Sequence, residues 1–390
     1  MTRPLFLILA SVTLDAMGIA LIFPILPGLL RTMTGRSEVA ELFGAMLALY
    51  GLMQFLCSPV LGVLSDRYGR RPMLLVSIAA SAVDYLMMAF APWLWLVFCS
   101  RALAGMTGAN IVVASAYIAD ITPEAQRAHR FGLFHAFSGV GFVAGLVVGG
   151  MLGDIWLREP FLVAAVLTGL NFLIVLLMLP ESHSPLREPI RYELLNPFAP
   201  LRWAFAYRSL APLLGICVLL SLAGQAYGAV WVLFTTDRFQ WTTTDVGLSL
   251  ALFGALVALV QACATGRVTA RIGERGTLVF GIVCETMALL GIAFATASWL
   301  AFAAVPLIAL GRIGLPALQT MQANSVSSEH QGRLQGVVVG LTGLTGICGP
   351  LLFTQVYAVS RTDWSGLVWI VCAATGALAI PIVLSMSRER

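Results

Sequence analysis

The chain alternates long apolar stretches with short polar clusters. A window of about 19 residues finds stretches of roughly 20 apolar residues, the length that a helix needs to cross about 30 Å of hydrocarbon. There are twelve, covering approximately residues 5–28, 41–62, 72–91, 94–116, 130–153, 159–179, 209–232, 245–266, 276–296, 298–320, 333–356 and 365–386. This pattern predicts an all-α polytopic membrane protein with twelve transmembrane helices.

The composition agrees with a membrane protein and excludes a soluble one. Of 390 residues, 59% are hydrophobic and 11% are charged, whereas about a quarter are charged in soluble domains. The 23 basic residues are all arginines lying mostly in the loops, which favours a lipid bilayer over a nucleic acid as partner. The seven cysteines lie in apolar stretches without CxxC spacing, so neither a disulfide framework nor a metal site is expected.

The arginines also predict the orientation. Twelve spans place both termini on one side, where 16 arginines lie, against five on the other side. The arginine-rich side is cytoplasmic by the positive-inside rule. Tryptophans gather at the opposite ends of the spans, as an interfacial belt does; they are Trp93, Trp95, Trp156, Trp231, Trp241, Trp299 and Trp364. We expect a multi-pass membrane protein with both termini cytoplasmic.

The polar stretch 181–208 divides the chain into two six-helix bundles, residues 1–180 and 209–390, with a cytoplasmic linker between them. The two halves share a loop sequence at a constant offset of 204 residues, GVLSDRYGRRP from Gly62 and GRVTARIGERG from Gly266. Repeated halves are the architecture of many secondary transporters.

Five acidic or arginine residues lie well inside the spans, away from their ends: Asp15, Asp84, Arg101, Glu285 and Arg312. A charge there costs about 2.5 to 3.5 kcal/mol on insertion scales, so each is a functional candidate. Asp84 and Arg101 lie at similar depth across a hairpin, and Glu285 with Arg312 repeats this arrangement in the second half. Each pair is interpreted either as a salt bridge that fixes helix packing or as part of proton coupling.

Asp15 has no cation at its depth in a neighbouring span. Such a carboxylate suits a group that takes up and releases protons; the alternative is a protonated Asp bonded to a backbone carbonyl. Glu285 can exchange Arg312 for a proton or a cationic substrate, or form a static pair. Gln54 and Gln261 occupy corresponding places in spans two and eight and are predicted to contact substrate, with packing as an equal alternative.

The loop after span two is a charged turn in which Asp66, Arg67, Arg70 and Arg71 lie beside Gly62 and Gly69. An aspartate there can cap a helix and pair with arginine. The segment is too short for a domain, and its charges are too mixed in sign for a nucleic-acid patch.

These motifs resemble those of the major facilitator superfamily. GVLSDRYGRRP resembles its loop signature, and RALAGMTGA at Arg101 resembles the RxxxG pattern of its proton-coupled drug exporters. GVGFVAGLVVGG resembles the antiporter motif of the fifth helix, with Gly139, Gly141, Gly145, Gly149 and Gly150. Segments around Asp15, Gln54, Asp84 and Asp120, with GPLLFT in span 11, are similar to the tetracycline/proton antiporters over nearly the whole chain.

The resemblance implies residue roles. It implies that Asp15, Asp84 and Glu285 are essential membrane carboxylates, that Asp66 and Arg70 belong to a gating loop, and that Gln54 is on the substrate side. The chain departs from the family pattern at Glu285 for Asp, Val257 for His, Leu146 for Pro and Arg312 for a small residue, and these changes leave the transported compound open.

The resemblance therefore implies a monomeric exporter of the bacterial inner membrane that exchanges a tetracycline-like drug for protons. We expect no cofactor. A divalent cation bound to the drug would leave no mark in the sequence. The alternatives are a multidrug or metabolite exporter, an importer, or a membrane-embedded enzyme. An enzyme is disfavoured because the sequence has no HExxH, GxSxG or phosphate-binding loop.

Overall fold

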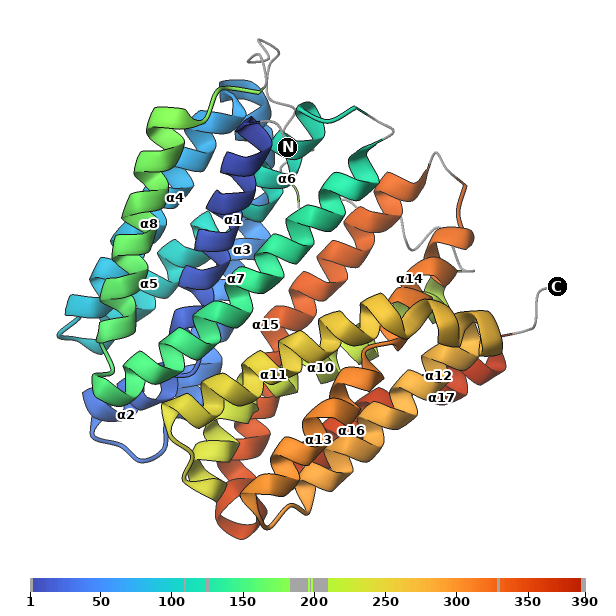
Figure 1. Cartoon of the computed structure of the whole chain (residues 1–390). Helices are drawn as coiled ribbons and strands as arrows, with labels where there is room; N and C mark the ends of the chain where they lie inside the picture. Colours follow the sequence, from blue (N-terminus) through green and yellow to red (C-terminus); the bar gives the residue numbers. More distant parts are fainter. Residues whose placement is uncertain are drawn as a thin grey trace. The chain divides into compact units, whose positions relative to one another are not determined.

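The computed structural model describes residues 3–108, 110–123, 126–182, 196, 198, 210–327 and 330–386. Within these ranges the chain forms helices and no strand (Figure 1). Twelve helical segments of 19 to 34 residues are long and apolar enough to cross a membrane, which confirms the predicted spans. Most of the predicted linker 181–208 lies outside the described residues.

The helices overlap all twelve predicted spans, but several extend beyond them, to Tyr68 instead of residue 62, to Phe239 instead of residue 232 and to Trp364 instead of residue 356. They are α1 (Arg3–Ile22), α2 (Leu26–Thr34), α3 (Ala40–Tyr68), α4 (Arg70–Phe90), α5 (Leu94–Thr107), α6 (Asn110–Asp120), α7 (Arg127–Ile155), α8 (Glu159–Met178), α10 (Ala211–Phe239), α11 (Thr243–Cys263), α12 (Thr265–Ala293), α13 (Ser298–Gly311), α14 (Gly314–Asn324), α15 (Gln331–Trp364), α16 (Leu367–Ala377) and α17 (Ala379–Ser385). The first span was predicted to run on to residue 28, but α1 ends before Pro24, because a proline cannot donate the next helical hydrogen bond.

The internal repeat is visible in the backbone as well as in the sequence. Both ends of α5 and α6 are related to those of α13 and α14 by the offset of 204 residues. Gly69 has φ 100° and Gly273 has φ 73°, a positive φ that glycine adopts without steric cost. The two copies of the charged loop therefore turn the chain in the same way, because the helical backbone is interrupted at Gly273 within α12 as it is at Gly69 between α3 and α4.

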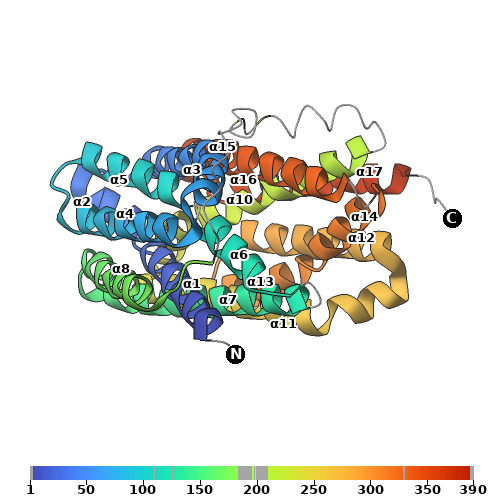
Figure 2. The same ribbon diagram turned by 90° about the horizontal axis from the view of Figure 1, so that it is seen from above.

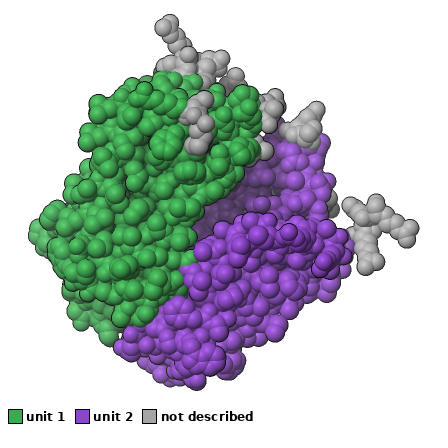
Figure 3. Space-filling model, viewed as in Figure 1, with its two compact units in different colours: residues 1–39, 49–197, 242–251 green, residues 40–48, 198–241, 252–390 purple. Residues whose placement is uncertain are grey.

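The helices pack into two compact units, which are coloured separately in Figure 3. Unit 1 comprises residues 1–39, 49–197 and 242–251, and unit 2 comprises residues 40–48, 198–241 and 252–390. In unit 1, α1 packs on α7 and α8, and α4 packs on α8; in unit 2, α10 packs on α15 and α16, and α12 packs on α16 (Figures 1 and 2). Helices at equivalent positions of the two repeats therefore pack against equivalent neighbours in their own unit.

The start of α11 belongs to unit 1 because it is bonded to the end of α7. The Asp154 carboxylate accepts the backbone N–H groups of Thr243 at 2.8 Å and Thr244 at 3.2 Å. Thr242 and Asp245 also cap the helix, since Asp245 N–H donates to Thr242 Oγ1 at 3.2 Å. A carboxylate at a helix N-terminus satisfies free N–H groups and opposes the positive end of the dipole.

Glycines of the predicted antiporter motif allow α7 to approach α1 closely. Gly141, Gly145 and Gly149 recur every four residues on one face of α7. A Cβ atom added at these positions would contact the α1 backbone at Thr13, Met17 and Leu21, respectively. Gly150 faces the backbone of Thr243, whereas Gly139 faces open space.

Alanine at Gly145 is expected to lower the free energy of unfolding by about 1 to 3 kcal/mol, because a methyl group would press on the α1 backbone. The same change at Gly139 is the matched control, since no atom lies within 4 Å of its added Cβ. Thermal unfolding of the two purified variants in detergent measures the difference. Equal stability of the two would contradict the packing role of Gly145.

Candidate transport site

Asp15 lies halfway along α1 beside a cavity of about 190 Å³ within unit 1. The Nδ2 atom of Asn110, the first residue of α6, donates a hydrogen bond to Asp15 Oδ1 at 3.2 Å. Asp15 forms no ion pair with any residue in the described ranges. The Asp15 carboxylate, which was expected to lack a cation, therefore has an amide partner. The sequence analysis did not single out Asn110. The one feature that could have indicated it is that Asn110 is a polar residue within an apolar span.

Asp84 and Arg101 form the ion pair that was expected between α4 and α5. Arg101 Nη2 donates to both carboxylate oxygens of Asp84, at 2.9 Å and 2.7 Å. Ser100 Oγ donates to the same carboxylate, a contact that the sequence did not reveal. Asp84 is 1% exposed and Arg101 is 7% exposed, so each charge depends on the other for compensation.

Glu285 and Arg312 form a second pair within unit 2, with 3.2 Å between Oε1 and Nη2. Each side chain is 15% exposed. The Arg312 guanidinium also lies over the Phe253 ring, 5.9 Å from its centre, and this cation–π partner was not predicted. By the offset of 204 residues, Glu285 corresponds to Ser81 in the first half, and Arg312 corresponds to Gly108. The second pair therefore repeats the first in kind but not at equivalent positions.

The predicted gating loop is held together by Arg70, the first residue of α4. Its Nη1 atom lies 2.6 Å from Asp66 Oδ1, and its Nε atom lies 3.1 Å from Asp120 Oδ2 at the end of α6. Ser65 Oγ accepts a further hydrogen bond from Arg70 at 2.6 Å. The structure thus joins Asp66 and Arg70 of the loop motif to Asp120, which was named from a separate segment.

Glu181, just after α8, completes this cluster and was missed by sequence reasoning. Its carboxylate accepts the backbone N–H groups of Arg70 at 2.9 Å and Arg71 at 3.2 Å, at the start of α4. An acidic side chain there stabilises the helix N-terminus. Arg67 instead lies over the Tyr68 ring, 5.6 Å from its centre, and Gly62 faces open space.

The two predicted substrate-contacting glutamines differ in their surroundings. Gln54 Nε2 donates to the Gly108 carbonyl at 3.3 Å and to Tyr50 Oη at 3.5 Å, which links α3 to the end of α5. Gln261 is exposed near the end of α11 and forms no hydrogen bond with the part of the chain that the structure describes. Similar places in the two spans therefore do not give similar contacts.

Comparison with known proteins identifies the family. The profile of the Major Facilitator Superfamily matches residues 8–236 and 213–390. The chain belongs to this superfamily. It is 49% identical to the tetracycline resistance protein, class C, of Escherichia coli, over 97% of this chain and 95% of that protein. It is 47% identical to the class G protein of Vibrio anguillarum, over 96% of this chain and 95% of that protein.

Solved structures show the same superfamily fold. The nucleoside transporter NupG matches with a TM-score of 0.78 and 15% identity, covering 100% of both chains. The human organic anion transporter MFSD10 matches with a TM-score of 0.70 and 22% identity, covering 98% of this chain and 99% of its own. The superfamily match, together with the twelve apolar helices in the described ranges, identifies the chain as a multi-pass membrane transporter. The predicted roles of its site residues stay predictions.

Proposed function

We propose that this transporter exports tetracycline-type drugs across the bacterial inner membrane in exchange for protons. The observation that carries the proposal is the identity of 49% and 47%, over nearly the full length, with two tetracycline resistance proteins. The intramembrane carboxylates supply groups that can bind protons. A proton that moves inward releases about 2.3 kcal/mol per 100 mV of membrane potential.

In this proposal, residues 1–180 and 209–390 are the two halves that alternate access to the two sides of the membrane. Asp15, the Asp84–Arg101 pair and the Glu285–Arg312 pair are the proton-coupling groups, and protonation and drug binding favour opposite orientations. The cluster around Arg70 holds the chain in one orientation. Gln54 and Gln261 contact the drug.

We also propose a membrane topology and an oligomeric state. Both termini and the segment 181–208 face the cytoplasm. The transporter acts as a monomer that needs a proton gradient and no cofactor. It performs transport without catalysing a chemical reaction.

The experiment is expression in an efflux-deficient bacterium, with minimum inhibitory concentrations measured across a panel of unrelated drugs. Protection confined to tetracyclines is expected. Tetracycline uptake into inverted membrane vesicles, abolished by a protonophore, tests the direction of transport and its coupling to protons.

The departures from the family pattern at Glu285, Val257 and Leu146 favour a multidrug or metabolite exporter as the second candidate. Protection against several drug classes would support a multidrug exporter, and protection against no drug would support a metabolite exporter.

Asp66→Asn is expected to lower transport by about 5- to 150-fold, the range of a coupling free energy of 1 to 3 kcal/mol, and to leave tetracycline binding measurable. The reason is that Asp66 pairs with Arg70 in the loop and does not line the Asp15 cavity. Uptake into vesicles and equilibrium binding measure the two effects. Arg67→Gln is the matched control, because Arg67 belongs to the same loop but lies over Tyr68. Normal transport by Asp66→Asn would remove the gating role.

A further inference from the structure

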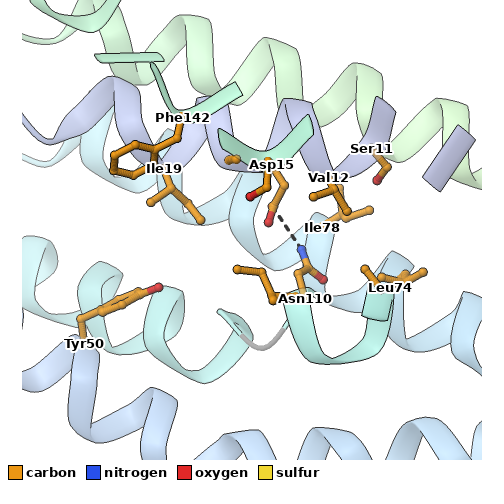
Figure 4. A pocket seen from close by; sticks show the side chains of 13 residues that line it. Ser11, Val12, Asp15, Ile19, Tyr50, Leu74, Ile78, Asn110 and Phe142 are labelled. Carbon is orange, nitrogen blue, oxygen red and sulfur yellow. Dashed lines mark hydrogen bonds between the residues drawn. The ribbon is translucent and has the colours of Figure 1, made fainter. Parts of the chain in front are cut away.

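The cavity beside Asp15 has two hydrogen-bond acceptors on one wall. Figure 4 shows Asp15 and Asn110 turned toward each other, with Val12, Ile19 and Phe142 around them. Asn110 donates its Nδ2 proton to Asp15 Oδ1, which leaves the Asn110 carbonyl oxygen, Oδ1, to accept. The carboxylate and this carbonyl therefore offer acceptors and negative charge to the same space.

The Asn110 carbonyl oxygen has no partner among the described residues, although Asn110 is only 6% exposed. A buried acceptor left unpaired costs about 1 to 3 kcal/mol, and such groups are rare in folded proteins. The neighbouring Asp15 carboxylate has no cationic partner in the described chain. Both groups would be satisfied by a ligand that carries a positive charge and an N–H donor.

The other walls decide which cation fits. The rest of the lining is mainly apolar, with Val12, Ile19, Ile78 and Phe142 beside the hydroxyl groups of Ser11, Tyr50 and Ser138. A single carboxylate among neutral groups does not replace the hydration shell of a metal ion, and the apolar side chains do not replace that of a free ammonium ion. An ammonium group with alkyl substituents instead places its alkyl groups against these walls and its N–H toward the acceptors. An aromatic ring such as that of Phe142 also attracts an organic cation.

The size of the cavity limits how much of a ligand it holds. About 190 Å³ is smaller than the roughly 300 to 1,000 Å³ of a pocket that encloses a whole drug-sized molecule. The cavity is large enough for one substituent of such a drug. The remainder of the drug would then lie outside this space.

We propose that this cavity binds the dialkylammonium substituent of the exported drug. This inference rests on the proposed function and adds a substrate-binding residue to it. Asp15 binds the positive charge, and the Asn110 carbonyl accepts the ammonium N–H. The Asn110 Nδ2 group holds the Asp15 carboxylate in place for this contact.

The test compares tetracycline, which carries a dimethylamino group, with the analogue in which hydrogen replaces that group. Transport into inverted vesicles gives KM and maximal rate for both compounds. The parent transporter is expected to show a KM about tenfold lower for tetracycline, because the analogue would leave a buried acceptor unpaired. Asn110→Leu, of similar size, is expected to weaken this preference by raising the KM for tetracycline alone, because Asp15 keeps its charge but the accepting carbonyl is lost.

Ser115→Ala is the matched control, because Ser115 lies on α6, bonds to the Val112 carbonyl and does not line the cavity. Equal KM values for both compounds in the parent would overturn the inference while the proposed efflux stands. Equal changes for both compounds in Asn110→Leu would also overturn it. Transport of neither compound by the parent would overturn the proposed function itself. The parent comparison needs no variant, so it decides even if Asn110→Leu does not fold.

Discussion

Arg101→Ala is expected to abolish drug efflux and to lower the free energy of unfolding by about 3 to 5 kcal/mol, because it leaves a buried carboxylate without its cation. The Asp84 carboxylate receives two hydrogen bonds from Arg101 and one from Ser100. Only the serine would remain in the variant. Thermal unfolding in detergent and tetracycline uptake into vesicles measure the two effects.

A double variant separates stability from transport. In Asp84→Asn combined with Arg101→Gln, both charges are absent and an amide pair can still form a hydrogen bond between α4 and α5. We expect this variant to recover most of the stability and none of the proton-coupled transport. Recovery of both would show that the pair only fixes the two helices, and full activity of Arg101→Ala at parental expression would exclude any functional role.

Glu285→Gln is expected to lower proton-coupled exchange by about 5- to 150-fold, equivalent to losing a coupling free energy of 1 to 3 kcal/mol. The reason is that a neutral amide permanently mimics the protonated carboxyl group and cannot alternate between a proton and Arg312. The variant should still fold, because the amide oxygen can accept from Arg312 where Glu285 Oε1 does now. Drug-driven proton release from vesicles measures this coupling.

Drug-for-drug exchange, which needs no net proton movement, is the control and should persist in Glu285→Gln. Glu285→Asp retains the charge and should keep part of the coupling. If Glu285→Gln exchanges drug for protons as well as the parent does, the carboxylate is structural. Coupling would then rest on Asp15 and Asp84.

The two ion pairs illustrate what depth along a span can predict. Asp84 and Arg101 are separated by one short connection, so counting residues from its tip was sufficient to expect their contact. The same counting predicted the contact of Glu285 with Arg312. It did not reveal that the equivalent residues in the first half are Ser81 and Gly108, and not Asp84 and Arg101. It also did not reveal that Phe253 on α11 contacts Arg312.

The sequence by itself determined the twelve spans, the internal repeat and the isolated charges, because each depends on neighbouring residues along the chain: apolar length must match the hydrocarbon, and an intramembrane charge is costly wherever it lies. Only the tertiary structure decided the partners. Asn110 meets Asp15, and Glu181 caps α4, through helices that are distant in sequence. Gln54 is bonded while Gln261 is exposed. Such contacts depend on how helices pack and rotate about their axes, which hydrophobicity along one chain does not specify.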